Sequence, residues 1–335
     1  MSKPRVSILI PAHNAADWIA DTVTSAIGQT WPNKEIIVVD DGSTDRTREV
    51  LSQFDPRLVS VIFQRNQGAA AARNHAFSIS NGDFIQWLDA DDLMSPDKIE
   101  RQMAVFDAER DRMSLLSSGW GYFAYRPSRA KFIPTALWQT QSPLEWLVNK
   151  LELNLHMQTA TWLTSRTLAE AAGPWNPSIL TDDDGEYFCR VLLKCSKVRF
   201  VPEGRVYYRV NGAARLSNVS RSDRRRESQF QSMCLHIRYI RSLEDTPRVR
   251  RACLGYIRTW LHEFYPERPD LYEKLQELAE GLGSRIERPR LRWKYAWMRP
   301  LIGLRRAKAA QTALPAIKAS ISRRWDKACL AIERR

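Results

Sequence analysis

Three acidic clusters are the residues of this chain best suited to carry chemistry. They are Asp40-Asp41, Asp89-Ala90-Asp91 and Asp182-Asp183-Asp184. Neighbouring aspartates repel one another unless a cation or hydrogen-bond donors compensate their charge. Each cluster therefore indicates either a site that binds a ligand or a turn whose carboxylates are solvated.

The second cluster directly follows an apolar run at residues 84–88 and has the pattern of a metal site. Carboxylates beside a diphosphate usually hold Mg²⁺ or Mn²⁺, which keep several waters and bridge phosphate oxygens. The alternative is a solvated loop in which Asp92 or Ser95 caps a helix that starts near Pro96. A position at the end of a strand favours the metal site.

The third cluster precedes an apolar helical pattern and offers a candidate general base. One aspartate is enough to cap that helix, so three in a row exceed this need. Crowded carboxylates raise one another's pKa, which suits a group that takes a proton near neutral pH. We therefore expect one of these aspartates to deprotonate an acceptor hydroxyl.

The first cluster and the segment around Gly68 are candidates for binding a nucleotide. Asp40-Asp41 leads into Gly42, which is also ordinary turn chemistry; in the functional interpretation one carboxylate accepts a hydrogen bond from a base edge or a ribose hydroxyl. Free backbone N–H groups after Gly68 would attract phosphate. Arg73, about one helical turn further, is either a bidentate phosphate donor or a surface arginine.

The elements that must position these residues alternate between strand and helix. Apolar runs predict strands at residues 6–10, 35–39, 59–63 and 84–88, with helical spacing between them. The unbroken run at 35–39 fits a strand buried on both faces, as in a parallel sheet. This alternation predicts a doubly wound α/β sheet, in which ligands bind outside the carboxyl ends of the strands.

Composition and missing motifs exclude several classes of protein. The chain has 335 residues, of which 44% are hydrophobic and 27% charged, so we expect a folded protein of roughly two domains. It contains neither a GxGxxG after the first strand nor a GxxxxGK[ST], which disfavours a dinucleotide oxidoreductase and a P-loop NTPase. Five cysteines without a CxxC pair support neither a zinc ribbon nor a disulfide scaffold and predict a reduced, cytosolic chain.

Five motifs, in this order and spacing, resemble glycosyltransferase family 2. They are VSILIPAHN at 6–14, SAIGQT at 25–30, EIIVVDDGSTD at 35–45, NQG at 66–68 with ARN at 72–74, and LDADD at 88–92. The resemblance covers roughly residues 4–110 and continues more loosely to about residue 217. It implies a GT-A fold, which is a Rossmann-like doubly wound mixed sheet, and transfer of a sugar from a nucleoside-diphosphate sugar with inversion.

The resemblance also implies roles for individual residues. The nucleotide-sugar site would comprise Pro11, Ala12, Asn14, Asp40, Asp41, Gly68, Arg73 and Asp89, and the metal ligands would be Asp91 and Asp89, holding Mn²⁺ or Mg²⁺. The family's base lies in a Glu-Asp pair seven and six residues before an arginine. Counting back from Arg190 gives Asp183 and Asp184. Asp184 is therefore assigned as the base, and Asp183, which replaces the Glu, as a supporting carboxylate.

Charge and patterning divide the chain into three parts. Residues 1–286 hold 37 basic and 35 acidic side chains, whereas residues 287–335 hold 14 basic and 3 acidic ones, a net +11 of the total +13. We expect a catalytic domain over 1–219, with a nucleotide-binding half at about 1–110 and an acceptor half at about 111–219. A C-terminal helical extension would follow, made of an appendage over 220–286 and a basic amphipathic tail over 287–335.

The tail combines tryptophans and aliphatic residues at helical spacing with basic side chains around them. The apolar residues are Trp293, Trp297, Leu301, Leu304, Leu314, Ile317, Ile321, Trp325, Ala328 and Ile332. This combination fits an anionic membrane surface. The alternatives are a helix docked on its own domain and a site for nucleic acid or a protein partner.

Taken together, these patterns predict a metal-dependent inverting glycosyltransferase of cell-surface or lipid-linked glycan synthesis, cytoplasmic and peripheral on the inner face of the membrane. Its partners would be a UDP-, dTDP- or GDP-sugar and a glycan or lipid-linked acceptor; the nearly neutral body argues against nucleic acid. A sugar nucleotidyltransferase is the alternative enzyme, disfavoured because residues 11–14 supply neither a Gly-rich loop nor a basic signature. A basic module that binds nucleic acid or membrane without catalysis is the other alternative.

Overall fold

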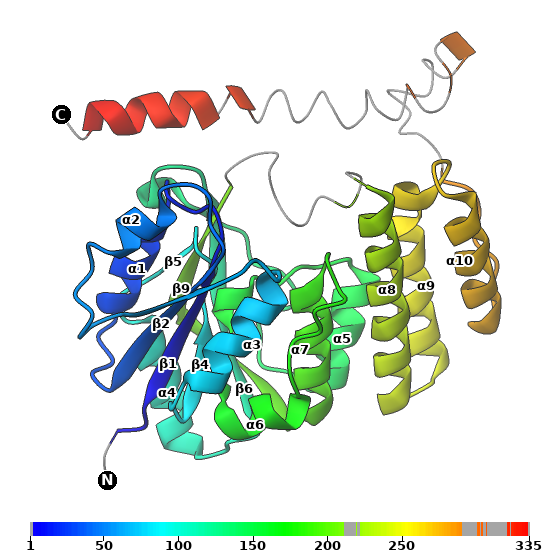
Figure 1. The fold of residues 1–335 in the computed structure, drawn as a ribbon. Coiled ribbons are helices and arrows are strands. Elements are labelled where there is room, and N and C mark those ends of the chain that lie inside the picture. Colours follow the sequence, from blue (N-terminus) through cyan, green and yellow to red (C-terminus); the bar gives the residue numbers. More distant parts are fainter. Residues whose placement is uncertain are drawn as a thin grey trace.

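Two β-sheets with helices packed around them form the body of the protein (Figure 1). The computed structural model describes residues 3–210, 219, 222–289, 300, 301, 303, 306, 320, 321 and 323–333. The larger sheet has the strand order β3-β2-β1-β4-β8. Its strands are β1 (Val6–Ala12), β2 (Lys34–Asp41), β3 (Ser60–Gln64), β4 (Phe84–Trp87) and β8 (Thr164–Ser165). The first four run parallel, and β8 pairs with β4 in the antiparallel sense.

The smaller sheet has the strand order β5-β9-β6-β7. Its strands are β5 (Leu93–Met94), β6 (Ser114–Phe123), β7 (Lys131–Phe132) and β9 (Lys197–Arg209). The long strands β6 and β9 are parallel, with a register shift at Ser118/Gly119, while β5 and β7 pair at the edges in the antiparallel sense. A single bridge between Leu116 and Leu163 links the two sheets. The resemblance implied one mixed sheet, and the structure divides it into these two.

Helices cover both sheets and extend beyond them at one end. They are α1 (Ile19–Ile27), α2 (Thr47–Leu51), α3 (Ala69–Ile79), α4 (Lys98–Glu109), α5 (Pro143–Glu152), α6 (Arg166–Ala172), α7 (Asp183–Lys194), α8 (Asp223–Leu243), α9 (Pro247–Phe264) and α10 (Pro269–Gly281). Helix α3 packs on β1 and β2, and α4 packs on β6 and β9. Figure 1 shows α8, α9 and α10 side by side; α8 contacts α5 and α7, α9 contacts α5, and α10 contacts α9.

The predicted strand and helix alternation of the N-terminal part is confirmed. Each of the four predicted strands overlaps an observed one, and the unbroken run Ile36–Val39 is fully buried between helices and neighbouring strands. Burial on both faces is what a central parallel strand requires. This arrangement brings the carboxyl ends of β1, β2, β3 and β4 to one edge of the sheet, where the site is built.

The alternative interpretation of the segment after β4, in which Asp92 or Ser95 caps the next helix, is wrong. Helix α4 begins at Lys98 with Asp97 as its N-cap residue, so neither Asp92 nor Ser95 caps it. Asp92 is instead fully buried, where it accepts hydrogen bonds from the backbone of Arg209, at 2.8 Å, and from Gln158. These partners lie 117 and 66 residues away in the sequence. Asp92 therefore makes long-range hydrogen bonds in the core instead of capping the next helix.

The last described segment of the C-terminal tail contacts the body of the protein. Residues 323–333 are helical, and Arg126, just beyond β6, pairs with Asp326 and Glu333, each at 2.7 Å. The backbone N–H of Tyr125 also donates to Asp326 at 2.9 Å. The remaining tail residues singled out by sequence lie outside the described residues; they are Trp293, Trp297, Leu304, Leu314 and Ile317. Within the described segments, no helix combines the length and apolar character needed to cross a bilayer.

Candidate active site

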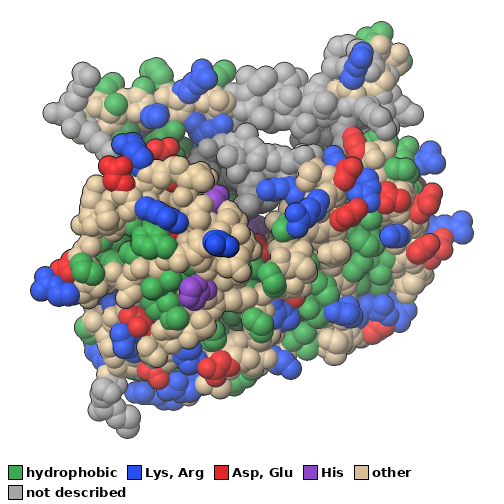
Figure 2. Space-filling model, viewed as in Figure 1, with side chains coloured by type: hydrophobic (Ala, Val, Ile, Leu, Met, Phe, Trp, Pro, Cys, Tyr) green, Lys and Arg blue, Asp and Glu red, His purple; other side chains and the backbone are tan. Residues whose placement is uncertain are grey.

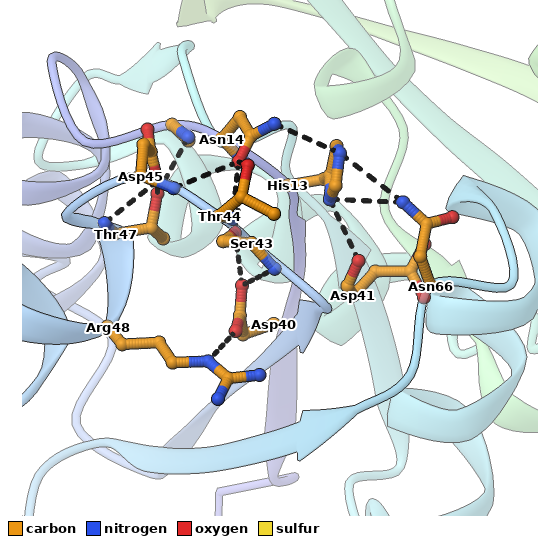
Figure 3. Close-up of polar contacts among 11 residues, drawn as sticks. His13, Asn14, Asp40, Asp41, Ser43, Thr44, Asp45, Thr47, Arg48 and Asn66 are labelled. Atoms are coloured by element: carbon orange, nitrogen blue, oxygen red, sulfur yellow. Dashed lines mark hydrogen bonds and ion pairs between the residues drawn. The ribbon is translucent and has the colours of Figure 1, made fainter.

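The first acidic cluster lies at the end of β2 and organises the turn that follows. Asp40 is buried; one of its oxygens accepts from the backbone and hydroxyl of Ser43, and the other accepts from Arg48 Nε at 2.8 Å (Figure 3). Asn14, after β1, uses its side-chain oxygen to accept from the backbone N–H of Thr44 at 2.8 Å. Asn14 itself has a left-handed backbone, with φ of 50°. Both predicted ligand residues therefore brace the turn.

Asp41 ties the end of β2 to the loop before α3. Its Oδ1 accepts from the backbone N–H of Gln67 and from the side chain of Gln64, and its Oδ2 accepts from the backbone N–H of Gly68, all at 2.8 Å. Gly68 is the N-cap residue of α3 and has a φ of 93°, which a side chain rarely tolerates. Asp41 and Gly68, 27 residues apart, are thus brought into direct contact.

The second cluster follows β4, and its two carboxylates and the adjoining Asp92 have different surroundings. Asp89 is partly exposed and pairs with Arg73 at 2.8 Å. Asp91 is half-buried, and its backbone carbonyl accepts from Arg209 Nε at 2.7 Å. Burial, together with the charges of Asp91 and Asp89, raises the pKa of Asp92 well above its usual value. The two carboxylates nearest solvent are therefore those predicted to hold a metal.

Arg73 joins the second cluster to the third. Its guanidinium donates to Asp89 Oδ1 through one nitrogen, at 2.8 Å, and to Asp183 Oδ2 through another, at 2.7 Å. It is almost fully buried, and it lies over the ring of Trp175, 4.3 Å from the ring centre. Burial acts to lower the pKa of Arg73, but Asp183 and Asp89 together raise it above its ordinary value. This arginine is therefore a permanent cation between two predicted functional carboxylates.

The third cluster occupies the start of α7. Asp182 is the N-cap residue, with a left-handed backbone and no capping hydrogen bond from its side chain. Asp183 faces Arg73, whereas Asp184 accepts from the hydroxyl of Thr159 at 3.3 Å and from the backbone N–H of Gly185 at 2.9 Å. Burial raises the pKa of Asp183 to about 6, and the neighbouring carboxylates of Asp184 and Asp89 add to this against the opposing charge of Arg73.

A small cavity adjoins Asp184. Its wall is made by α5, α7 and the segment between them, and includes Trp146, Lys150, His156, Trp162 and Phe188. His156 also lies against the rings of Trp120 and Tyr208 from the smaller sheet. The candidate base is thus placed beside an aromatic wall.

Within the described residues, no group of three or more His, Cys, Asp or Glu side chains is arranged to hold a metal. Asp89 and Asp91 form a pair, separated by one residue, at the end of β4. Magnesium in enzymes is typically held by one or two carboxylates, with waters and substrate phosphates completing its shell. The pair fits a cation of that type and does not form a complete protein cage.

The structure adds residues to which the sequence assigned no role. Arg209, at the end of β9, is buried and contacts the backbone carbonyl of Asp91 and the side chain of Asp21. Thr159 and Gln158 reach Asp184 and Asp92 from a short 3₁₀ segment. Arg209 ends the strand sequence VYYR at 206–209, and this arginine after an aromatic strand is the sequence signal that could have identified it. Thr159 and Gln158 lie in a segment without any motif.

Comparisons with known proteins agree with this geometry. The family model described as Glycosyl transferase family 2 matches residues 7–154. The Escherichia coli enzyme WfaP, a UDP-Glc:alpha-D-GlcNAc-diphosphoundecaprenol beta-1,3-glucosyltransferase, is 30% identical over 254 residues, covering 75% of this chain and 91% of WfaP. The chain belongs to glycosyltransferase family 2. The predicted family and enzyme class are thereby confirmed.

Other relatives of this glycosyltransferase match over less of their length. An uncharacterized glycosyltransferase of Haemophilus influenzae is 38% identical over 106 residues, covering 31% of this chain and 42% of that protein. The chain therefore spans about two fifths of this relative.

Among solved structures, the crystal structure of S. aureus TarS 1-349 in complex with UDP-GlcNAc superposes with a TM-score of 0.68. Sequence identity to TarS is 17%, and the superposition covers 83% of this chain and 81% of that one. At this identity the likeness concerns the fold, and it confirms the predicted GT-A architecture.

Proposed function

We propose that this glycosyltransferase moves a sugar from a nucleoside-diphosphate sugar to an acceptor hydroxyl with inversion, using a catalytic domain over residues 1–219. The observation that carries the proposal is the Arg73 bridge. The Arg73 guanidinium donates hydrogen bonds both to Asp89, which follows β4, and to Asp183, which is next to the candidate base. A donor phosphate near Asp89 would therefore lie close to an acceptor hydroxyl near Asp184.

Asp184 is the better candidate for the base. Asp183 is engaged by Arg73, so its carboxylate is held as part of an ion pair. Asp184 contacts a neutral hydroxyl and a backbone N–H, and it borders the cavity beside the aromatic wall. In the proposed step Asp184 takes the proton of the acceptor hydroxyl, whose oxygen forms the new bond to the anomeric carbon. The bond to the diphosphate breaks on the opposite face, and inversion follows.

Asp91 and Asp89 would hold the divalent cation, Mn²⁺ or Mg²⁺. When bound, such a cation neutralises charge on the diphosphate leaving group. Among the described contacts, Arg73 takes one oxygen of Asp89. The other oxygen and the half-buried Asp91 supply the hard oxygen donors that these cations prefer.

The nucleotide would lie along the ends of β1 and β2. Pro11 and Ala12 form the end of β1, and Asp41 with Gly68 shapes the loop beside it. Asn14 and Asp40 would act one step removed, since their side chains hold the turn after β2.

A UDP-sugar donor and a lipid-linked acceptor are the first substrates to test. WfaP is named for a UDP-glucose donor and a diphosphoundecaprenol acceptor, and a TarS structure holds UDP-GlcNAc. This supports a role in cell-surface or lipid-linked glycan synthesis.

The full chain should be incubated with Mn²⁺ and radiolabelled UDP-glucose, UDP-N-acetylglucosamine, dTDP-glucose or GDP-mannose, with and without a polyprenyl-diphosphate sugar. Transfer or slow hydrolysis of one donor supports the proposal. No reaction with any donor overturns it. Exchange of labelled pyrophosphate with a sugar phosphate would instead support a nucleotidyltransferase.

We also propose that the tail meets an anionic membrane at the inner face. Asp326 and Glu333 face Arg126, while Ile321, Trp325 and Ile332 are 65%, 74% and 73% exposed. Figure 2 shows apolar and basic side chains on the outer side of this helix. The tail's acids are few, and two of its three pair with Arg126. The outward surface therefore combines apolar and basic groups, which suits anionic lipid headgroups.

Vesicle flotation tests this second proposal. The wild type should float with phosphatidylglycerol vesicles and not with phosphatidylcholine vesicles, and Trp325→Ala/Ile332→Ala should lose flotation. The control is Leu58→Ala/Ile133→Ala, which removes two exposed apolar side chains of the body (54% and 61% exposed). Equal flotation of both double variants overturns the membrane proposal, as does salt-sensitive binding to DNA without binding to vesicles.

A further inference from the structure

One face of helix α8 is polar although it is buried. Ser228, Ser232 and His236 are each almost fully buried, and Tyr239 continues the same face. Their spacing of four, four and three residues places all of them on one side of a helix. Burying polar side chains costs free energy unless they find hydrogen-bond partners. The partners of this face therefore show what it is for.

Each of the four side chains of this polar face contacts the segment that leads into and begins α7. The hydroxyl of Ser228 accepts from the backbone N–H of Leu180 at 2.7 Å and of Thr181 at 3.2 Å. The hydroxyl of Tyr239 donates to Glu186 at 2.9 Å. The two proposed catalytic carboxylates lie between these contact points, in residues 180–186.

Asp182 is the centre of the arrangement. Its Oδ2 accepts from the hydroxyl of Ser232 at 3.0 Å and lies 3.6 Å from His236 Nδ1, which is itself 3.1 Å from the hydroxyl of Tyr256 in α9. The backbone of Asp182 is left-handed, with φ of 59° and ψ of 34°. A non-glycine residue keeps such a backbone only when its surroundings hold it there.

The side chain of Asp182 also closes over the first turn of α7. A Cβ atom at Gly185 would collide with the Asp182 carboxylate, so the glycine is required by this packing. The direction of the Asp182 side chain and the start of α7 are therefore coupled. Whatever holds Asp182 also sets where Asp183 and Asp184 point.

We infer that α8 is a positioning element of the active site, which acts through Ser228, Ser232 and His236 on the segment that carries the base. This inference rests on the proposed assignment of the base to Asp184. The helical appendage thus has a role in the reaction through contacts with the segment before the base, made by residues of α8. Ser232 is the best residue to test, because its hydroxyl is the direct hydrogen bond from α8 to the Asp182 side chain.

The experiment compares Ser232→Ala and Ser228→Ala with Ser242→Ala, an exposed serine at the far end of the same helix. With the best donor from the panel above, kcat of Ser232→Ala should fall by about 10- to 100-fold, because small misplacements of catalytic groups are that costly. The KM for the donor should stay unchanged. Ser232→Thr, which keeps the hydroxyl, should recover most of kcat.

Hydrogen exchange provides a readout that does not depend on turnover. Backbone amides in residues 180–186 should exchange faster in Ser232→Ala than in wild type, and at the wild-type rate in Ser242→Ala. Unchanged kcat in Ser232→Ala and Ser228→Ala, with an active wild type, overturns the positioning role alone. A kcat loss equal to that of Ser242→Ala does the same. A wild type inactive with every donor overturns the proposed function instead.

Discussion

The acidic residues at the end of β2 and those around Arg73 lie at the same end of the fold, but their partners differ. Asp41 is satisfied by a side-chain amide and backbone N–H groups, and Asp40 by the backbone and hydroxyl of Ser43 and by Arg48. Asp89 and Asp183 share one buried guanidinium, and they lie far apart in the sequence. The first group stabilises the turn after β2 and the loop before α3. The second places several charges close together where the end of β4 meets the start of α7.

The hydrogen-bond partners of these aspartates therefore distinguish structural carboxylates from reactive ones, although both kinds lie at strand or helix ends on the same side of the fold. A carboxylate whose donors all belong to one turn stabilises that turn, and its removal should lower the free energy of unfolding. A carboxylate crowded by like charges and shared cations is a candidate for chemistry. Variants of the two groups should therefore separate activity from stability.

Asp184→Asn should show the largest effect. The amide cannot take the acceptor proton, so transfer should fall by about 10³-fold, within the range of general base catalysis. Donor binding, measured as thermal stabilisation by UDP with Mn²⁺, should persist. Asp107→Asn, a change to an exposed acid on α4, is the control. Near wild-type transfer by Asp184→Asn would show that the base lies elsewhere.

Asp91→Ala should come next. Removing one of the two proposed metal ligands should reduce transfer by about 100-fold, because cation stabilisation of the leaving group is worth several kcal/mol. The extra thermal stabilisation that Mn²⁺ gives in the presence of UDP should also disappear. Retention of that metal-dependent stabilisation would place the cation elsewhere.

Arg73→Lys should weaken the junction without removing its charge. A lysine cannot donate to both Asp89 and Asp183 from a fixed fork. Loss of one charged hydrogen bond is worth about 1.5 to 3 kcal/mol, so we expect transfer to drop by about 10-fold or more. Steady-state kinetics with saturating donor measures this. Full activity of Arg73→Lys would contradict the bridge as the joining element.

The pH dependence should follow Asp183. Its pKa is raised to about 6, so the carboxyl is protonated below that pH and ionised above it. Because the folded-state pKa lies above the ordinary value, protonation of this group stabilises the fold, and that contribution is lost as pH rises through about 6. Activity should move the other way, since protonation weakens the contact with Arg73.

A pH profile of kcat/KM tests this prediction. We expect a decline of a few-fold between about pH 6.5 and 5.5, as one group of that pKa protonates. In Asp183→Asn, where no such group titrates, this limb should be absent. An identical limb in that variant would assign the titration to another residue.

Asp40→Ala and Arg48→Ala should show the smallest effects on chemistry. Asp40 is a buried acceptor, so its removal should lower the free energy of unfolding by about 1 to 3 kcal/mol. Arg48 is half exposed, and its loss should cost less than about 1 kcal/mol. Urea unfolding measures both. A large loss of kcat without loss of stability would erase the contrast between the two acidic groups.

The N-terminal half could be predicted from sequence because its signals are local. Each strand is a short apolar run, and the carboxyl end of a parallel strand determines where Asp41 and Asp89 lie. Helix α3 likewise starts directly after Gly68 and ends before Ser80, so residues typical of turns flank it on both sides. Periodicity and turn residues are enough for such elements.

The junction of the site could not be predicted in the same way. Arg73 was expected to meet phosphate or solvent, yet 110 residues separate it from Asp183, with which it pairs. The contacts of Thr159 with Asp184 and of Ser232 with Asp182 also join separate elements. No local pattern encodes such pairs, because they depend on how elements pack after they form.

The two ion pairs of Arg126 have a consequence for the C-terminal helix. Asp326 and Glu333 are seven residues apart and so lie on the same side of that helix. A single arginine therefore fixes the rotation of the helix about its own axis. Trp325 directly precedes Asp326 and so projects about 100° away from it around the helix axis. A rotation of that size in one direction would turn Trp325 toward the body and carry the two acids away from Arg126. The positions of Asp326 and Glu333 therefore determine which side chains of this helix, Trp325 and Ile332 among them, stay exposed to solvent.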